Sequence, residues 1–369
     1  MAWGKEVKLV RFKFSLGVDW SLFILPLILT GIGTAIIFSI TYGTNSTLAL
    51  SQVIFFVIGL GLAIFLTLFD YRTLKGLYLI LYIIGMILLV LVIVVGSKSF
   101  GATRWIDLKF FQLQPSEIFK LIILIVLAKF FSDWQEINWQ KILLILVLVG
   151  VPVFLILRQP DLGTASVVFI GLIAVLFLSP IKKIYLIIAL ALMMALSPLG
   201  WHFLKTYQKQ RIESFINPSA DPHGAGYNVS QAKIAVGSGG LWGMGLGKGS
   251  QSQLNFLPVA HTDFIFAGTA EATGFAGSTF LILVLIFLVI RVINVAKVAK
   301  DSFGMYLAGG IGAIFLFQIL VNIGMNLGIM PVTGIPLPFV SSGGSSMITN
   351  MAAIGILQSI YLRHKKITF

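Results

Sequence analysis

Asp263 is the residue of this sequence whose type and position most clearly suit it for chemistry. It lies in the run His261-Thr262-Asp263-Phe264, after a long polar segment and at the start of an apolar stretch. Carboxylates are costly near a hydrocarbon core, so one that lies there is a functional candidate. A base at the water–lipid boundary suits a substrate that is half lipid and half sugar or phosphate. The alternative is that Asp263 only caps the following helix.

Two other segments carry charged residues that could take part. Glu117 and Lys120 stand three residues apart, so they can pair on one helix face, either as a structural ion pair or as part of a substrate site. Asp161 either caps the helix that follows it or positions a substrate. Basic residues on the outer side favour an anionic partner such as phosphate, and the alternative is that outer loops tolerate some Lys and Arg or contact anionic lipid. The candidates are Arg104, Lys120, Arg158 and Arg211.

A glycine-rich run at 237–250 follows a short helix predicted over 229–236. Such a density of glycine lets backbone N–H groups approach an anion closely, and a flexible surface loop is the alternative. The run is not a nucleotide P-loop, because no strand precedes it and the lysine spacing is wrong. Glu271 lies two turns beyond Asp263, at a depth where a carboxylate must be protonated, paired or facing a cavity.

The elements that must position these residues are membrane helices. The sequence is 58% hydrophobic and 11% charged, which excludes an ordinary soluble fold. Apolar runs that are long enough to cross a bilayer predict an all-α polytopic membrane protein with about ten spans. We predict these spans at residues 18–42, 48–69, 74–95, 116–132, 141–157, 162–179, 182–204, 263–290, 303–329 and 343–362.

The chain is predicted to form one integral membrane domain over residues 1–369. An outer segment over 96–115, which contains Trp105, suits an interfacial hairpin or half-helix at the lipid headgroups. A large extracytoplasmic loop over 205–262 connects spans seven and eight, and the absence of cysteine means that no disulfide braces it. The segment 331–346 is rich in proline and serine, which predicts unwound backbone that faces a cavity.

Basic residues predict the orientation. They are concentrated in the N-terminal arm, in the C-terminal tail and in alternate loops, so both termini should be cytoplasmic. The first apolar run is too long for a cleavable signal peptide. The net charge of +13 does not argue for nucleic acid, because topology explains its cytoplasmic share.

Six ordered motifs together resemble the SEDS family (shape, elongation, division and sporulation), and its RodA branch more than its FtsW branch. They are Arg104-Trp105, Gln114-Pro115-Ser116-Glu117, the run Gln159 to Thr164, the run Gly224 to Tyr227, the run His261 to Phe264, and Gly343-Gly344-Ser345. The run Gln251 to Leu254 before Phe256 favours the RodA branch. The match covers nearly the whole chain.

The resemblance implies an inverting peptidoglycan glycosyltransferase of the bacterial inner membrane. Such an enzyme polymerises lipid II at the outer face during cell elongation, with a class B penicillin-binding protein of the PBP2 type as its partner. Asp263 then matches the family's catalytic aspartate. The expected substrate-positioning residues, besides the basic ones, are Glu117, Asp161, His261, Thr262 and Ser345. A divalent cation, Mg²⁺ or Mn²⁺, could assist, and the sequence offers no ligand set for it.

The sequence departs from the family pattern at three positions. Val259 stands where Glu is usual, Ala272 where a second acid is common, and Ser342 where an aromatic residue is usual. Two other functions fit the apolar spans, a flippase for lipid-linked precursors and a non-catalytic scaffold. The enzyme is favoured because the acids gather near the outer face and no inverted repeat with paired broken helices is evident.

Overall fold

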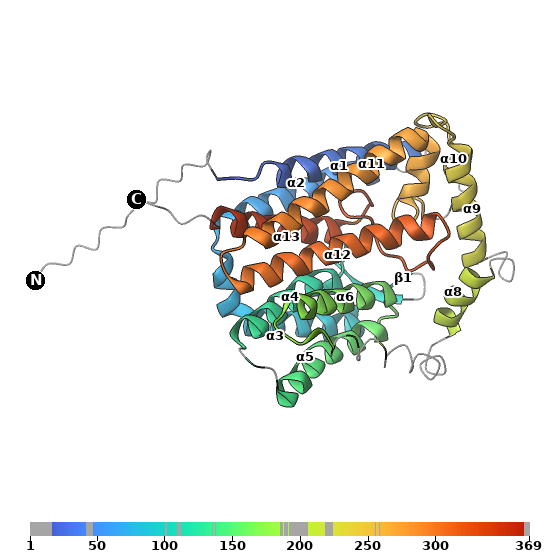
Figure 1. The fold of residues 1–369 in the computed structure, drawn as a ribbon. Helices are drawn as coiled ribbons and strands as arrows, with labels where there is room; N and C mark the ends of the chain where they lie inside the picture. The colour runs from blue at the N-terminus through green and yellow to red at the C-terminus, as the bar shows by residue number, and fades with distance from the viewer. Residues whose placement is uncertain are drawn as a thin grey trace, which may run out of the picture.

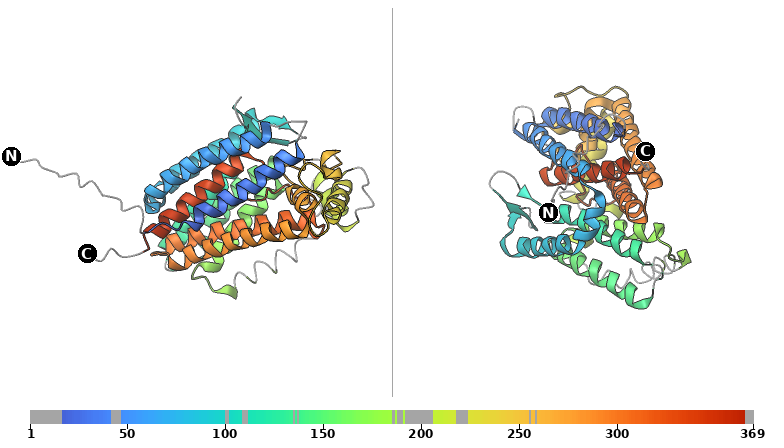
Figure 2. Two further views of the ribbon diagram at one scale, coloured as in Figure 1. Left: turned by 90° about the horizontal axis from the view of Figure 1, so that it is seen from above. Right: turned by 90° about the vertical axis from the view of Figure 1, so that its left-hand side faces the viewer.

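The computed structural model of the chain describes residues 17–41, 47–99, 102–108, 112–134, 136, 138–184, 187, 191, 206–217, 224–254, 256–257 and 259–364. Long helices lie side by side in a bundle, and shorter helices cover one end of it (Figures 1 and 2). In this part of the chain, six helices are long and apolar enough to cross a membrane. The predicted helical, multi-pass class is confirmed.

The helices are α1 Ser21–Ile40, α2 Thr47–Leu68, α3 Tyr71–Val95, α4 Pro115–Asp133, α5 Trp139–Arg158, α6 Leu162–Leu178, α8 Thr206–Ile216, α9 Ala225–Ser238, α10 Ser250–Gln253, α11 Ile265–Val298, α12 Ser302–Asn326 and α13 Gly344–Leu362. Most of the seventh predicted span, 182–204, lies outside the described residues. The eighth was predicted too short, since α11 continues to Val298. Arg291, in this added part of the helix, forms an ion pair with Asp19. The ninth was predicted too long, because Gly328 at φ 72° follows the end of α12.

The outer segment forms a small antiparallel sheet of β1 Ser97–Ser99, β2 Ala102–Asp107 and β3 Gln112–Leu113. Ser97 pairs with Trp105, and Ile106 pairs with Leu113. The hairpin prediction is therefore right and the half-helix alternative is wrong. The expectation of an all-α chain is corrected by this small sheet. Its cause is local, because residues with high β-propensity, such as Thr103, Trp105 and Ile106, favour strand pairing.

α11 is broken in its N-terminal part. Gly274 has φ 65° and ψ −163°, which no continuous helix allows. In an unbroken helix, the N–H groups of Phe275 and Ala276 would donate to the carbonyls of Glu271 and Ala272. The break therefore frees two donors and two acceptors inside a predominantly apolar element.

The glycine-rich loop, residues 239–249, supplies partners for all four groups. The carbonyls of Gly240 and Leu241 accept from the two freed N–H groups, at 2.8 and 3.1 Å. The N–H groups of Met244 and Gly245 donate to the two freed carbonyls, at 2.9 and 3.0 Å. The loop thus replaces two consecutive hydrogen bonds of the helix with four of its own.

This insertion explains the glycines better than an anion site does. A Cβ atom at Gly239 would collide with the carbonyl of Ala270, and one at Gly243 with the carbonyl of Ala272. The expectation of an anion cradle is therefore wrong for Met244 and Gly245, whose N–H groups bond to helix carbonyls. Glu271 is paired, since its carboxylate accepts from the N–H groups of residues 251 and 252, at 2.8 and 3.1 Å.

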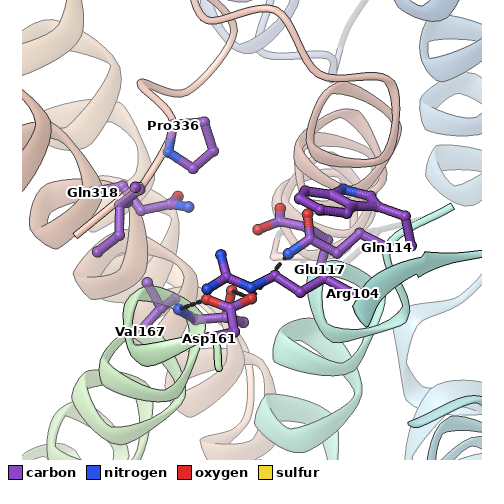
Figure 3. A pocket seen from close by; sticks show the side chains of 11 residues that line it. Arg104, Gln114, Glu117, Asp161, Val167, Gln318 and Pro336 are labelled. Carbon is purple, nitrogen blue, oxygen red and sulfur yellow. Dashed lines mark hydrogen bonds between the residues drawn. The ribbon is translucent and has the colours of Figure 1, made fainter. Parts of the chain in front are cut away.

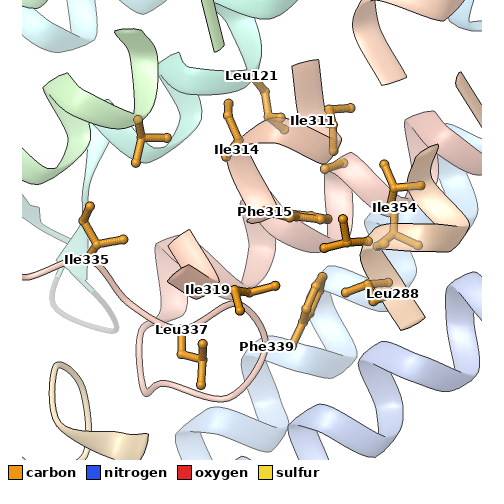
Figure 4. Close-up of a cluster of buried hydrophobic side chains, with 14 of the residues drawn as sticks. Leu121, Leu288, Ile311, Ile314, Phe315, Ile319, Ile335, Leu337, Phe339 and Ile354 are labelled. Carbon is orange, nitrogen blue, oxygen red and sulfur yellow. The ribbon is translucent and has the colours of Figure 1, made fainter. Parts of the chain in front are cut away.

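The segment between α12 and α13, residues 327–343, is not helical, and much of it is buried. The prediction of unwound backbone is right for residues 331–343 and wrong for 344–346, which form the first turn of α13. Gln52 donates to the carbonyl of Ser341 at 3.2 Å, and Ser341 Oγ accepts from the N–H of Leu337 at 2.8 Å. Phe339, at φ 64°, packs against Phe315 with ring centroids 5.7 Å apart (Figure 4). The irregular backbone is therefore held within protein and away from lipid.

Ion pairs join the ends of helices at the end of the bundle opposite the glycine-rich loop. Asp301 pairs with Arg72 at 2.9 Å and accepts from the Tyr71 hydroxyl at 2.6 Å. The N–H of Asp19 donates to Gln358 at 3.3 Å, which brings the two described ends of the chain together. Both described ends of the chain therefore lie on one side of the bundle.

Gly243→Ala is expected to destabilise the protein more than Gly240→Ala. Both glycines have positive φ, at 80° and 54°, so each substitution should carry a backbone cost of about 1–2 kcal/mol. Only the methyl group at position 243 meets the backbone of α11, whereas position 240 has open space. Thermal unfolding of the purified variants in detergent measures the difference. Equal midpoints would contradict the role of the insertion.

Candidate functional site

The backbone around Asp263 is fixed by two asparagines of α12. Asn322 and Asn326 are fully buried, and both side-chain amides donate to the carbonyl of Asp263, at 3.1 and 3.0 Å. Asn326 Oδ1 also accepts from the N–H of Ala267 at 2.9 Å, which satisfies a free donor in the first turn of α11. The N-cap residue of α11 is Phe264, so Asp263 is not the cap of this helix.

The residues before Asp263 bind the unwound segment 327–343. Ser341 Oγ donates to the carbonyl of Thr262 at 2.7 Å, and the N–H of Ser342 donates to the carbonyl of His261 at 2.9 Å. Burial lowers the pKa of the His261 imidazole, which favours its neutral form. The turn that bears Asp263 is therefore held from two sides, by α12 and by this segment.

The carboxylate of Asp263 is half-buried, and burial raises its pKa. The positive charge of Arg211 on α8 opposes this rise most strongly among the nearby charges, and Arg104 on β2 acts in the same direction. Asp161 adds to the rise by repulsion. Residues from four separate segments thus share one electrostatic environment.

A cavity of about 60 Å³ (Figure 3) lies next to the site, and Asp263 approaches it behind Gly334 without being one of its lining residues. Gly334 lines it, and a Cβ atom at Gly334 would lie 3.5 Å from Asp263 Oδ2. The other lining residues come from β2, from the start of α4, from α6, from α12 and from the unwound segment. They are Arg104, Trp105, Gln114, Glu117, Asp161, Thr164, Val167, Gln318, Ile335 and Pro336.

Asp161 caps α6, as the sequence predicts, and it also organises the cavity wall. Its carboxylate accepts from the N–H and the hydroxyl of Thr164 at 3.0 and 2.9 Å, and from the Gln114 amide at 3.0 Å. Arg104 donates to the carbonyl of Gln159 at 3.1 Å and to that of Pro160, where α5 ends. An arginine at a helix C-terminus is favourable, and its guanidinium borders the cavity.

Glu117 and Lys120 form the predicted pair, at 2.6 Å, with side chains only 5% and 1% exposed. Glu117 lines the cavity, whereas Lys120 lies behind it in the protein interior. The charge of Lys120 is therefore balanced inside the protein. The pair stabilises the cavity wall, and Lys120 does not face the cavity itself.

The remaining predicted residues differ in position. Ser345 lies at the start of α13, where its hydroxyl donates to the carbonyl of Gln112 at 3.0 Å and accepts from the N–H of Gln114 at 2.9 Å, so it supports the wall from behind. Arg158 is exposed, lies over the ring of Phe154 at 5.0 Å, and is not among the lining residues.

The three departures from the family pattern lie in different surroundings. Val259 takes φ 53°, a conformation that β-branched side chains rarely adopt. The carbonyl of Ala272 accepts from the glycine-rich loop, and Ser342 contributes its backbone N–H to the turn before Asp263. Position 342 therefore keeps this contact whatever side chain it carries.

Sequence reasoning missed three functional residues, all on α12. Asn322 and Asn326 hold Asp263, and Gln318 lines the cavity with its amide pointing inward (Figure 3). Gln318 is 1% exposed, and its Oε1 has no hydrogen-bond partner among the described residues. The signal was present, because three amides at intervals of four residues within an apolar span must share one helix face.

The described residues offer no preformed metal site. No group of three or more His, Cys, Asp or Glu side chains among them could hold an ion. The two cavity carboxylates are already engaged, Glu117 by Lys120 and Asp161 by its hydrogen-bond donors. These residues do not fit a cation held by protein ligands alone.

Lys120→Met is expected to destabilise the protein strongly, because it leaves the Glu117 carboxylate buried and unpaired. Loss of one partner of a buried pair costs about 3–5 kcal/mol, whereas replacing both partners with apolar residues is often nearly neutral. The double variant Glu117→Leu, Lys120→Met should therefore recover most of the thermal stability in detergent. A double variant no more stable than Lys120→Met would contradict this coupling.

Comparison with known proteins identifies the family to which this chain belongs. Residues 15–366 match the "Cell cycle protein" family of FtsW, RodA and SpoVE. The peptidoglycan glycosyltransferase MrdB of Escherichia coli K12 is 44% identical over 285 residues, which cover 77% of each chain. The stage V sporulation protein E of Bacillus subtilis is 35% identical over 354 residues, which cover 93% of this chain and 96% of that protein.

Two solved structures share the fold over nearly the whole chain. A chain of a peptidoglycan synthase complex that coordinates polymerization and crosslinking is 31% identical, with a TM-score of 0.84 over 95% of this chain and 99% of that one. The rod shape determining protein RodA of Thermus thermophilus is 29% identical, with a TM-score of 0.71 over 94% of this chain and 98% of that one. The chain is therefore a multi-pass bacterial membrane protein that belongs to the FtsW, RodA and SpoVE family.

Proposed function

We propose that this chain is an inverting peptidoglycan glycosyltransferase that polymerises lipid II at the outer face of the cytoplasmic membrane during cell elongation. The observation that carries the proposal is the half-buried carboxylate of Asp263, which lies beside a polar cavity and within the fields of Arg211 and Arg104. The similarity to MrdB, which is named a peptidoglycan glycosyltransferase, supports the same reaction.

In the proposed reaction, Asp263 is the general base. Its carboxylate takes the proton of the 4-hydroxyl of the acceptor N-acetylglucosamine while that oxygen bonds to the anomeric carbon of the donor N-acetylmuramic acid. The bond from this carbon to the pyrophosphate breaks, and its electron pair leaves with undecaprenyl pyrophosphate. Attack opposite the leaving group inverts the anomeric centre. The anchored backbone of Asp263 supports this role, because a fixed base needs little reorganisation.

The leaving group already carries negative charge, so it needs a positive environment more than a proton. Arg104 and Arg211 are our candidates, because both act on Asp263 electrostatically and Arg104 borders the cavity. We assign Lys120 a supporting role instead, because Glu117 balances its charge. Gln318, His261 and Thr262 remain candidates for positioning the sugars.

The orientation and the assembly complete the proposal. The end of the bundle with the Arg72–Asp301 and Arg291–Asp19 ion pairs would face the cytoplasm, so both termini would be cytoplasmic. A class B penicillin-binding protein is the proposed partner, in line with the synthase complex to which the chain is similar. Any Mg²⁺ or Mn²⁺ would be bound mainly through the substrate pyrophosphate, as Mg²⁺ commonly is.

Asp263→Ala should abolish the formation of glycan strands from purified lipid II, because loss of a general base typically costs about 10²–10⁴ in rate. The measurement compares wild type and variant in liposomes, each with the partner protein blocked at its own transpeptidase site. Asp133→Asn, at the far end of α4, is the matched carboxylate control. Strands formed by the variant at the wild-type rate would sink the assignment, and lipid II translocation without polymerisation would favour the flippase.

The rate should also depend on pH through Asp263. Burial raises the pKa of this carboxyl, and only the deprotonated form can act as a base. The rate should therefore be full above this raised pKa and fall as the pH drops through it. Arg211→Gln removes a charge that lowers the pKa, so the acid limb of the profile should move to higher pH. An unmoved acid limb would show that a different group controls it.

A further inference from the structure

The glycine-rich loop exposes large apolar side chains. Leu241 is 68% exposed, Trp242 83%, Met244 41% and Leu246 56%. Four such residues within six positions form a concentrated apolar patch, which in a folded protein normally marks a surface that another apolar phase covers. None of them lines the cavity, so the proposed reaction does not account for them.

The position of the loop indicates what covers this patch. α8 and α9 cross the outer end of the bundle, and the chain between α9 and α10 turns at the rim of that end, beside α1 and α11 (Figure 1). The N–H of Gly247 donates to Ser39 Oγ near the end of α1, at 2.7 Å. The loop therefore lies where two membrane spans meet the outer boundary of the bilayer.

Large apolar side chains are also exposed on α11 beyond the break. Phe275, which is bonded to Gly240 through its N–H, is 67% exposed. Further along the same helix, Phe280 is 55% exposed and Leu283 59%. Because α11 is long and apolar enough to cross a membrane, this side of it lies against acyl chains. The loop adds its own exposed apolar side chains beside the break at Gly274.

We propose that residues 241–246 of the glycine-rich loop insert into the outer leaflet of the membrane as a lipid anchor. Trp242 would lie at the headgroup level, where tryptophan is enriched, while Lys248, which is exposed, would remain in the aqueous headgroup layer. The loop is bonded to both sides of the break in α11, so the anchor also fixes the depth of residues 265–273. That segment directly follows Asp263, and the anchor therefore sets the height of the proposed base above the lipid.

Single cysteine variants test the depth directly, because the chain has no cysteine of its own. Trp242→Cys, Leu246→Cys and Lys248→Cys are spin-labelled in liposomes. Leu283→Cys on α11 is the lipid reference and Glu213→Cys on α8 the aqueous one. Accessibility to dissolved oxygen and to a water-soluble nickel complex is then measured. The ratio of oxygen to nickel accessibility should be several-fold higher at 242 and 246 than at 213 and 248, and lower than at 283, which lies deeper in the span.

A ratio at 242 that matches position 213 would overturn the proposal. So would high nickel accessibility at 242 that disappears only when the penicillin-binding protein is added, because the patch would then be a partner surface. The labelling needs no catalysis, so its outcome is independent of the proposed function.

As a second readout, Trp242→Phe should retain polymerisation and Trp242→Glu should lose a large part of it. Equal activity of the two variants would contradict the coupling to Asp263.

Discussion

The architecture depends on one constraint, that backbone N–H and C=O groups within a bilayer must find partners inside the protein. Continuous helices meet it automatically, and two places among the described residues depart from continuous helix, Gly274 and residues 327–343. Each departure is satisfied by another part of the chain. The loop backbone serves the first, and side chains such as Gln52 and Asn322 serve the second. The second departure adjoins the turn that bears Asp263, because Ser341 and Ser342 bond to the residues before it.

Asn322 and Asn326 turn this constraint into a positioning device. Their amides hold the backbone of Asp263 through its carbonyl and do not engage its carboxylate. Asn322 also donates to the carbonyl of Ile335 at 2.8 Å, so the same side chain sets the position of the unwound segment. One helix face therefore coordinates the base, the first turn of α11 and the cavity wall. Buried amides of this kind stabilise only when both ends are bonded, which ties the site to an intact bundle.

Much of the fold was predictable, because long apolar runs admit few structures in a membrane. The Glu117–Lys120 pair and the cap at Asp161 followed from spacing rules that act within one helix. The insertion of the glycine-rich loop could not be read in this way, since it joins residues some thirty positions apart and glycine at such density has several uses. The role of Asn322 was missed for a related reason. Helical spacing assigns a residue to a face but does not identify the element that this face contacts.

The charged side chains in and near the cavity wall are equal in number. Arg104, Lys120 and Arg211 are matched by Glu117, Asp161 and Asp263. These residues have no net charge together, so the site as a whole does not concentrate small anions from the surrounding water, although Arg104 and Arg211 can act locally on a bound pyrophosphate. A lipid-tailed substrate needs no attracting field, because the bilayer already concentrates it in the plane of the membrane. Entry to this cavity is then a two-dimensional search driven by partition into lipid, and dissolved salt should affect its rate only slightly.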